Sequence, residues 1–314
     1  NLQTRQGREL QQSILRRGTK EGFNGVDDVA GRAGGAQRIV SAEFSSEGNA
    51  AMVAIVSGSN QATRVDSWAI GDDLGSATKS AAMELPSELG ATAAVKPIDK
   101  DQFVSLNGDG AFLWDKAKGT HLRSFRANAA VVQSSFSSDG KYIVTGSRSI
   151  KIWDAETLQP LGKLEVAHDG PVRSVEFAPQ SMGGNPDYRL VSGGDDGTVR
   201  LWQWDPQAKS ITTVNEFTFA APVRSVAFSP DGASVLACGA GGVAKRWRIE
   251  SPSDPIVFQK AEAGGFVCVT SSRDGRWIAV GSTESVGYLW QIPEQGQAVG
   301  EPIELRGHSQ RIED

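Results

Sequence analysis

Short stretches of alternating apolar and polar residues recur along the chain, and six of them close on a tryptophan. The clearest copy is Val199-Arg200-Leu201-Trp202. The six tryptophans follow one another at intervals of 46, 39, 49, 45 and 43 residues: Trp68, Trp114, Trp153, Trp202, Trp247 and Trp290. Alternation with a period of two predicts half-buried strands, and self-similarity at about 40–50 residues is typical of a repeat architecture. The pattern therefore predicts an all-β protein, a β-propeller of four-stranded antiparallel blades.

One repeat shows the full order of its elements. Residues 172–177 alternate and stop at Ala178-Pro179, residues 189–193 form a second predicted strand, and residues 198–202 form a third. Between the second and third, Gly194-Asp195-Asp196-Gly197 predicts a hairpin turn of the Asp-Gly type. The following repeat, residues 223–247, has the same order of elements.

These repeats resemble the WD-repeat β-propeller family. Its repeat has a strand ending near Phe-Ser-Pro-Asp-Gly, an Asp-bearing turn and a strand closing on Trp-Asp. This chain supplies Phe228-Ser229-Pro230-Asp231-Gly232, Phe136-Ser137-Ser138-Asp139-Gly140, Ser272-Arg273-Asp274-Gly275, Trp114-Asp115 and Trp153-Asp154. The resemblance covers residues 37–314 and implies six recognisable blades, or seven with terminal closure. Residues 1–36 are predicted to be a non-repeat segment or linker, and residues 305–314 the start of a further repeat.

The resemblance also implies a hydrogen-bonded cluster of a His, a Ser or Thr, an Asp and the Trp within a blade. One repeat fills all four places, with His168, Ser192, Asp196 and Trp202. In other repeats the His place is taken by Asn128 or Ala221 and the Asp place by Gly241 or Glu284. A buried polar cluster helps only where every member is satisfied, so most blades are expected to rely on apolar packing.

By analogy with the family, partner contacts gather where the first strand of each blade begins. The equivalent positions here are Val40, Val132, Arg173, Arg224 and Phe266. Arginine and aromatic residues are enriched at interface hot spots, although ordinary packing and solvated arginine would account for the same residues. We therefore expect a non-catalytic scaffold that binds a protein or peptide through the loop rim and channel mouth.

The alternative is a propeller enzyme, a hydrolase or lyase with a channel-mouth site. The sequence has three histidines, no metal-ligand spacing such as His-Glu-x-x-His, no Gly-x-Ser-x-Gly elbow and no phosphate loop. We accordingly predict no catalytic residue, no metal and no cofactor. The net charge of −5 does not favour a nucleic-acid partner.

Cysteine content, hydropathy and composition lead to expectations about disulfides, membrane spans and the source of the protein. Cys238 and Cys268 are predicted to be buried thiols rather than a disulfide, since disulfide scaffolds are small and cysteine-dense. No stretch approaches 18 apolar residues, so no membrane span is predicted, and we expect a cytoplasmic protein. The 20 arginines against 12 lysines would suit a GC-rich bacterial source.

An open ring would leave apolar faces on its end blades. Those faces are predicted to carry Ile39, Phe44, Val53 and Ile55 on the first blade, and Trp277, Ile278 and Leu289 on the last. Exposed apolar patches mark interaction or aggregation sites. We therefore expect either closure of the first blade on the last or docking of these faces onto further repeats or another molecule.

Overall fold

The computed structural model describes residues 37–44, 50–57, 62–70, 77–89, 92–97, 101–107, 110–126, 133–164, 167–179, 186–260, 263–272, 274–293 and 299–306. Within these ranges the chain forms strands and one short 3-10 helix, η1 (Ser87–Leu89). Residues 1–36, Val132 and residues 307–314 lie outside them. The predictions made for those residues are therefore not addressed by the structure.

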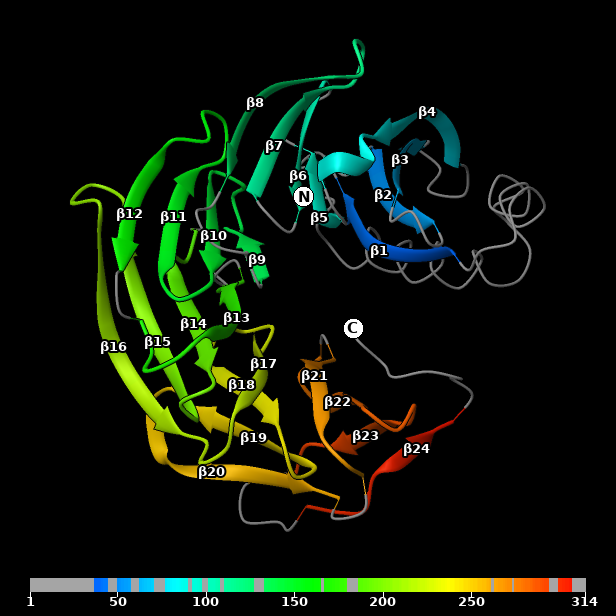
Figure 1. Cartoon of the computed structure of the whole chain (residues 1–314). Coiled ribbons are helices and arrows are strands. Elements are labelled where there is room, and N and C mark those ends of the chain that lie inside the picture. Colours follow the sequence, from blue (N-terminus) through cyan, green and yellow to red (C-terminus); the bar gives the residue numbers. More distant parts are fainter. Residues whose placement is uncertain are drawn as a thin grey trace. The chain divides into compact units, whose positions relative to one another are not determined.

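Within the described ranges the strands form six four-stranded antiparallel sheets, each built from consecutive strands (Figure 1). The all-β fold and the six blades predicted from the tryptophan spacing are confirmed. The chain divides into two compact units, Asn1–Ala130 with Ala155–Leu158, and Val131–Asp154 with Gln159–Asp314. We call them the N-terminal and C-terminal units.

The N-terminal unit holds blades 1 and 2. Their strands are β1 (Gln37–Phe44), β2 (Ala50–Ser57), β3 (Ala62–Ile70), β4 (Ala77–Leu85), β5 (Thr92–Pro97), β6 (Gln102–Asn107), β7 (Gly110–Asp115) and β8 (Thr120–Arg126). Apolar side chains from both blades form one buried cluster, in which Phe103 stacks on Trp114 with ring centroids 6.2 Å apart.

The C-terminal unit holds blades 3 to 6. Blade 3 contains β9 (Gln133–Phe136), β10 (Tyr142–Gly146), β11 (Ile150–Asp154) and β12 (Pro160–Leu164), and blade 4 contains β13 (Val172–Phe177), β14 (Arg189–Gly194), β15 (Thr198–Asp205) and β16 (Ser210–Thr218). Blade 5 contains β17 (Val223–Phe228), β18 (Ser234–Gly239), β19 (Val243–Arg248) and β20 (Ser251–Gln259). Blade 6 contains β21 (Phe266–Ser271), β22 (Trp277–Ser282), β23 (Gly287–Gln291) and β24 (Ile303–Leu305).

The core of the C-terminal unit lies between successive blades. Trp202 packs in the cluster shared by blades 3 and 4, Trp247 in the cluster shared by blades 4 and 5, and Trp290 in the cluster shared by blades 5 and 6. Glycine on the second strand permits the close approach. A Cβ on Gly193 would come 2.4 Å from Cγ1 of Val223 on the next blade, closer than real Cβ contacts. Each blade is therefore completed by its neighbour, and a single blade has no core of its own.

The residues predicted for the open face of blade 6 need a correction. Ile278 is fully buried in the core between blades 5 and 6. It pairs with Trp290 across β22 and β23, and directly paired residues share a face of the sheet, so both face blade 5. Trp277 and Leu289 are partly exposed. Closure of the ring stays a prediction.

First strands share a register irregularity. In five blades one extra residue is inserted where the first strand pairs with the second: Val40, Ala93, Arg173, Arg224 and Val267. A β-bulge leaves its extra residue out of the ladder and re-aims its side chain. In these five blades the bulges mark one structurally equivalent position, at the end of the blade where the first strand begins.

Candidate functional site

The four residues of the expected polar cluster come together in blade 4. Nε2 of His168 lies 2.7 Å from Oγ of Ser192, which also accepts a hydrogen bond of 2.9 Å from Nε1 of Trp202. Nδ1 of His168 lies 3.0 Å from Oδ1 of Asp196. His168 is 3% exposed and Ser192 is fully buried, so the cluster links the loop before β13 to strands β14 and β15 away from water.

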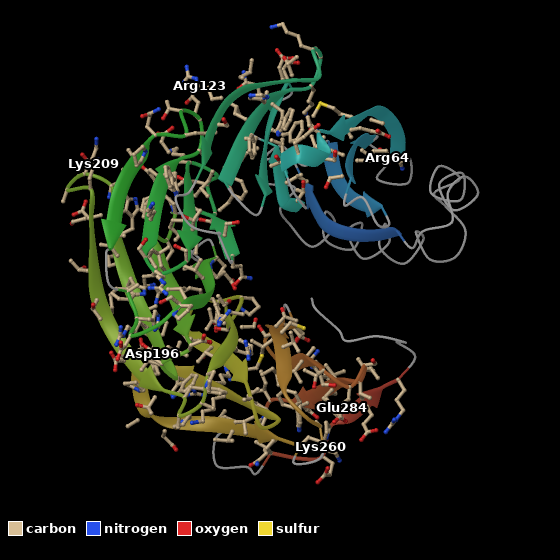
Figure 2. The ribbon with its side chains drawn as sticks, viewed as in Figure 1. Arg64, Arg123, Asp196, Lys209, Lys260 and Glu284 are labelled. Atoms are coloured by element: carbon tan, nitrogen blue, oxygen red, sulfur yellow. The ribbon has the colours of Figure 1, made fainter. Side chains whose placement is uncertain are left out.

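Asp196 is the ionised end of this cluster. Burial raises the pKa of its carboxyl, but hydrogen bonds outweigh burial and lower the pKa to about 2. The donors are the ring of His168, the backbone N–H and hydroxyl of Thr198, at 3.0 and 2.8 Å, and the backbone N–H of Asp169 at 2.9 Å. Asp196 lies in the turn between β14 and β15, at the end of the blade opposite Lys209 (Figure 2).

His168 is held neutral inside the cluster. Burial lowers the pKa of its imidazole in spite of the nearby carboxylate of Asp196. An ionised Asp196 can only accept, so Nδ1–H of His168 donates to it, and Nε2 then accepts from the hydroxyl of Ser192. Hydrogen bonds thus run in one direction from Trp202 through Ser192 and His168 to Asp196.

Thr198 and Gly194 belong to this cluster and were not identified from the sequence. The hydroxyl of Thr198 lies 3.0 Å from Nδ1 of His168. A Cβ on Gly194 would come 2.5 Å from the same nitrogen, so only glycine leaves room for the ring. The signal was present in the run from Ser192 to Thr198, which brackets the predicted Asp-Gly turn.

Other blades keep only part of the cluster. In blade 2, Nε1 of Trp114 donates to Ser105 at 2.8 Å, and in blade 3, Nε1 of Trp153 donates to Thr145 at 3.0 Å. In each of these blades the hydroxyl-bearing residue lies on the second strand, two residues after the residue that pairs with the tryptophan. In blades 5 and 6 the residues at that position are Ala237 and Val280. Those two blades therefore have an apolar residue where blade 4 has its central hydroxyl.

The rim positions Arg173 and Arg224 are the bulge residues of blades 4 and 5. Nε of Arg173 donates to Oδ1 of Asp195 at 2.8 Å, and Nη2 donates to Oδ2 of the same carboxylate. Hydrogen bonding from Arg173 lowers the pKa of Asp195, and the positive charge of Arg224 lowers it further. Arg224 is exposed. Two guanidinium groups thus lie near one carboxylate at this end of the unit.

The structure corrects one of the rim residues. Phe266 is 1% exposed and packs in the core between blades 5 and 6. Its register partner Ser282 corresponds to Gly194 and Gly239, so Phe266 is equivalent to the buried Val172 and Val223. Val267 takes the bulge position instead. Val40 is the bulge residue of β1, and Val132 is outside the described ranges.

First strands are also joined to one another by side chains that the sequence did not identify. Backbone N–H groups of the next blade donate to Gln133 (from Val175, 3.2 Å), Ser174 (from Val226, 3.0 Å) and Ser225 (from Val269, 3.3 Å). The Arg-Ser pair that recurs at 173–174 and 224–225 therefore has two roles. The arginine leaves the ladder at the bulge, and the serine binds the next blade.

Glu176 belongs to the same set of inter-blade acceptors. Its carboxyl lies between blades 4 and 5, where burial raises the pKa to about 8 and a hydrogen bond from the backbone N–H of Phe228 lowers it in part. The carboxyl is therefore largely protonated at neutral pH and accepts through its carbonyl oxygen. The corresponding residue of blade 5 is Ala227, so the next interface lacks this contact.

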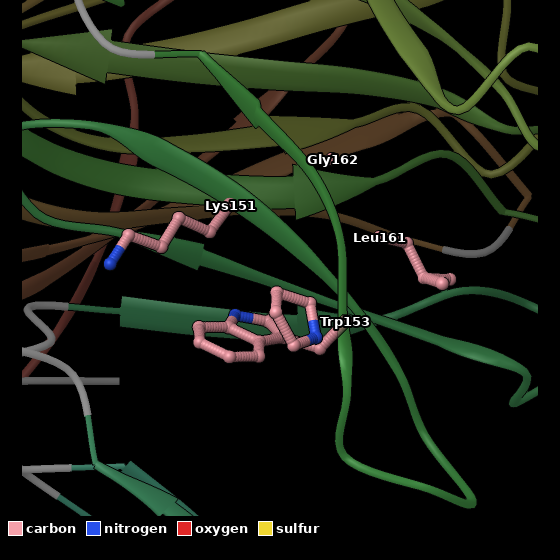
Figure 3. A pocket seen from close by; sticks show the side chains of 5 residues that line it. Lys151, Trp153, Leu161 and Gly162 are labelled. Atoms are coloured by element: carbon pink, nitrogen blue, oxygen red, sulfur yellow. The ribbon is translucent and has the colours of Figure 1, made fainter.

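A groove of about 300 Å³ lies on blade 3 against β11 and β12 (Figure 3). It is lined by Lys151, Trp153 and residues 160–162, with Nζ of Lys151 5.7 Å from the centroid of the Trp153 ring. Lys151 is the one charged side chain among these lining residues. Elsewhere in the described ranges no group of three or more His, Cys, Asp or Glu side chains could hold a metal ion.

Two further sequence predictions can be compared with the structure. Neither Cys238 nor Cys268 is in a disulfide, and of the two only Cys238 is buried. No helix within the described ranges is long and apolar enough to cross a membrane.

Comparison with known proteins identifies repeats in this chain. Residues 119–154, 158–203 and 210–248 match the family described as WD domain, G-beta repeat. Each matched segment starts at the outer strand of one blade, β8, β12 or β16, and ends with the tryptophan-bearing strand of the next. The repeat in the sequence is therefore offset by one strand from the blade in the structure.

The relatives with similar sequences match this chain over only part of their own length. The chain is 30% identical to WD repeat-containing protein 55 of Mus musculus over 227 residues, 69% of this chain and 52% of that protein. It is 29% identical to the protein of the same name from Bos taurus, over 69% of this chain and 53% of the relative. Polyadenylation factor subunit 2 of Candida albicans is 25% identical over 43% of this chain and 23% of its own length. The chain spans about half the length of the two mammalian relatives.

These relatives come from mammals and a yeast, so the bacterial source expected from the arginine excess is not supported. An excess of arginine over lysine is a bias of composition that the fold does not require.

Proposed function

This chain is a WD-repeat protein folded into β-propeller blades, and from that premise we propose that it is a non-catalytic scaffold that binds a protein or peptide. The binding surface is the end of the C-terminal unit where the first strands begin. We call this surface the bulge rim and define it by the bulge residues Arg173, Arg224 and Val267 together with the adjacent turns at Asp195 and Ala240. A cytoplasmic location remains a prediction.

The observation that carries this proposal is the repeated bulge. It places one side chain from each of blades 4, 5 and 6 at the same structural position, outside the hydrogen-bonded ladder. In two of the three blades that side chain is an arginine, a residue type favoured at interface hot spots. Functional contacts in such a fold reside in the loops and strand ends rather than in the buried cores.

A selection of short random peptides displayed on phage tests the proposal with the full chain as bait. We expect peptides that bind the wild-type chain and lose binding when Ala240→Trp places a bulky side chain on the exposed turn of blade 5. The matched control is Arg248→Ala, which removes an exposed arginine from the opposite end of the same blade. Peptides whose binding is unchanged by Ala240→Trp but weakened by Arg248→Ala would place the binding surface at the end of the blade opposite the bulge rim.

The alternative of a propeller enzyme is tested with a further variant at the bulge rim. Esters, lactones and glycosides are offered to the wild-type chain and to Arg224→Ala. Turnover that is reproducible and lost in Arg224→Ala would overturn the non-catalytic scaffold.

A further inference from the structure

Blades 4 and 5 present the same rim position with one difference. Val172 pairs with Gly194 and Val223 pairs with Gly239, so the bulge arginines Arg173 and Arg224 are equivalent. The residue after each paired glycine is then also equivalent, and it is Asp195 in blade 4 but Ala240 in blade 5. Blade 4 supplies a carboxylate for its arginine, and blade 5 does not.

The blade 4 pair shows the geometry that this position favours. Nε and Nη2 of Arg173 each donate to a different oxygen of Asp195, a two-pronged arrangement. The backbone N–H of Asp195 also donates to the carbonyl of Pro171 at 3.1 Å, which fixes the turn beside β13. Such paired contacts between guanidinium and carboxylate are stronger and more directional than single hydrogen bonds.

In blade 5 the turn equivalent to the one that holds Asp195 is exposed. Ala240 is exposed, and a Cβ added to Gly241 would meet nothing within 4 Å. Arg224 makes no ion pair or side-chain hydrogen bond with the described residues, although its charge is close enough to lower the pKa of Asp195. Arg173 occupies both oxygens of Asp195, so Arg224 has no paired contact of this kind with a carboxylate of the described residues.

We infer that the partner supplies the missing carboxylate. An Asp or Glu side chain of an acidic peptide segment binds Arg224 as Asp195 binds Arg173, with its carboxylate beside Ala240. This inference rests on the proposed function, because it specifies the chemistry of a partner at the bulge rim. Blade 4 acts as the internal template, and its own arginine is already occupied.

The decisive variant is Ala240→Asp, which gives blade 5 the residue that blade 4 has and lets the chain occupy its own site. Its matched control is Ala240→Asn, a side chain of the same shape without the charge. Arg224→Gln removes the guanidinium and tests the same contact from the other side. All three changes fall on exposed positions, and circular dichroism with thermal melting checks that each variant is folded.

The probes are synthetic, fluorescently labelled versions of the peptides that bind the wild-type chain and do not bind Ala240→Trp. We expect each to contain an Asp or Glu whose replacement by Asn or Gln weakens binding by about tenfold, as for loss of one charge-assisted pair. Ala240→Asp and Arg224→Gln weaken the same peptides by about tenfold, and Ala240→Asn changes binding by less than about twofold. Wild-type affinity also falls as salt is raised.

The outcomes separate this inference from the proposed function. Some peptides could lose binding to Ala240→Trp and yet bind Ala240→Asp and Arg224→Gln as well as the wild type, and also tolerate replacement of their own Asp or Glu. Such peptides would support the bulge rim as the binding surface but would refute the inference that a partner carboxylate binds Arg224. If no selected peptide is sensitive to Ala240→Trp, the proposed function itself fails and the inference fails with it.

Discussion

Blades 4 and 5 share strand order, bulges and a buried tryptophan, yet they are held and exposed differently. Blade 4 joins Trp202 to Asp196 through a complete hydrogen-bonded chain and pairs Arg173 with Asp195 at its rim. Blade 5 has Ala237 in place of the central hydroxyl, Gly241 in place of the aspartate, and an arginine without an internal carboxylate. The difference indicates that blade 4 satisfies its polar groups internally, whereas blade 5 relies on apolar packing and leaves Arg224 exposed.

The largest expected effect is on the polar cluster itself. His168→Ala removes one donor to Asp196 and the acceptor for the buried hydroxyl of Ser192, so the hydroxyl proton loses its partner and the hydrogen-bonded chain is broken. We expect a loss of about 2–3 kcal/mol in the free energy of unfolding, measured by urea denaturation. Glu284→Gln, an exposed change at the aspartate place of blade 6, should cost less than about 0.5 kcal/mol. Equal losses would contradict the distinction between the blades.

Acid should weaken blade 4 through Asp196. Its pKa is about 2 in the folded chain and about 3.9 in an unfolded one. A lowered pKa contributes stability above the unfolded value, and this stability is lost as the pH falls from about 4 to about 2. We expect a loss of about 2 kcal/mol from this group across that window. Asp196→Asn should remove this part of the pH dependence, and an unchanged acid profile would argue against the ionised carboxylate.

The hydroxyl groups that accept from the tryptophans should contribute differently to the free energy of unfolding in different blades. Ser192→Ala leaves Nε1 of Trp202 and Nε2 of His168 without a partner, whereas Ser105→Ala removes the hydroxyl that accepts from Trp114. We expect losses of about 2 and about 1 kcal/mol in the free energy of unfolding. Chemical denaturation followed by tryptophan fluorescence measures both. A larger loss for Ser105→Ala would mean that the complete cluster adds nothing.

A further effect that depends on pH is expected at the interface between blades 4 and 5. The pKa of Glu176 is raised to about 8, so its contribution to stability is fully present below the unfolded pKa of about 4.3 and is lost as the pH rises toward 8 and above. Glu176→Gln keeps an acceptor for Phe228 and cannot ionise. We expect the variant to melt at a higher temperature than the wild type at about pH 9, and the difference between the two to shrink as the pH falls toward about 4. An identical dependence of melting temperature on pH in the variant and the wild type would refute the raised pKa of Glu176.

Several features of the fold followed from residue type and spacing because they are local. Trp68 to Trp290 mark the third strand of every blade, and the turn at residues 194–197 lies between the strands predicted on either side. Strand alternation and Asp-Gly turn chemistry depend on neighbouring residues only, which is why the pattern predicted them. The polar cluster of blade 4 was inferred from a family resemblance, since its members are far apart in the sequence.

Tertiary structure decided which side chains reach the rim and which hold the blades together. A bulge shifts the register by one residue, so Val267 and not Phe266 is equivalent to Arg224, and alternation alone could not show this. The roles of Ser174 and Ser225 depend on backbone N–H groups of the next blade, about 50 residues away in the chain. The sequence by itself determined the strands, the turns and the repeat. Register between strands decided that Arg173 meets Asp195 and that the equivalent position beside Arg224 is Ala240, because register sets which side chains meet.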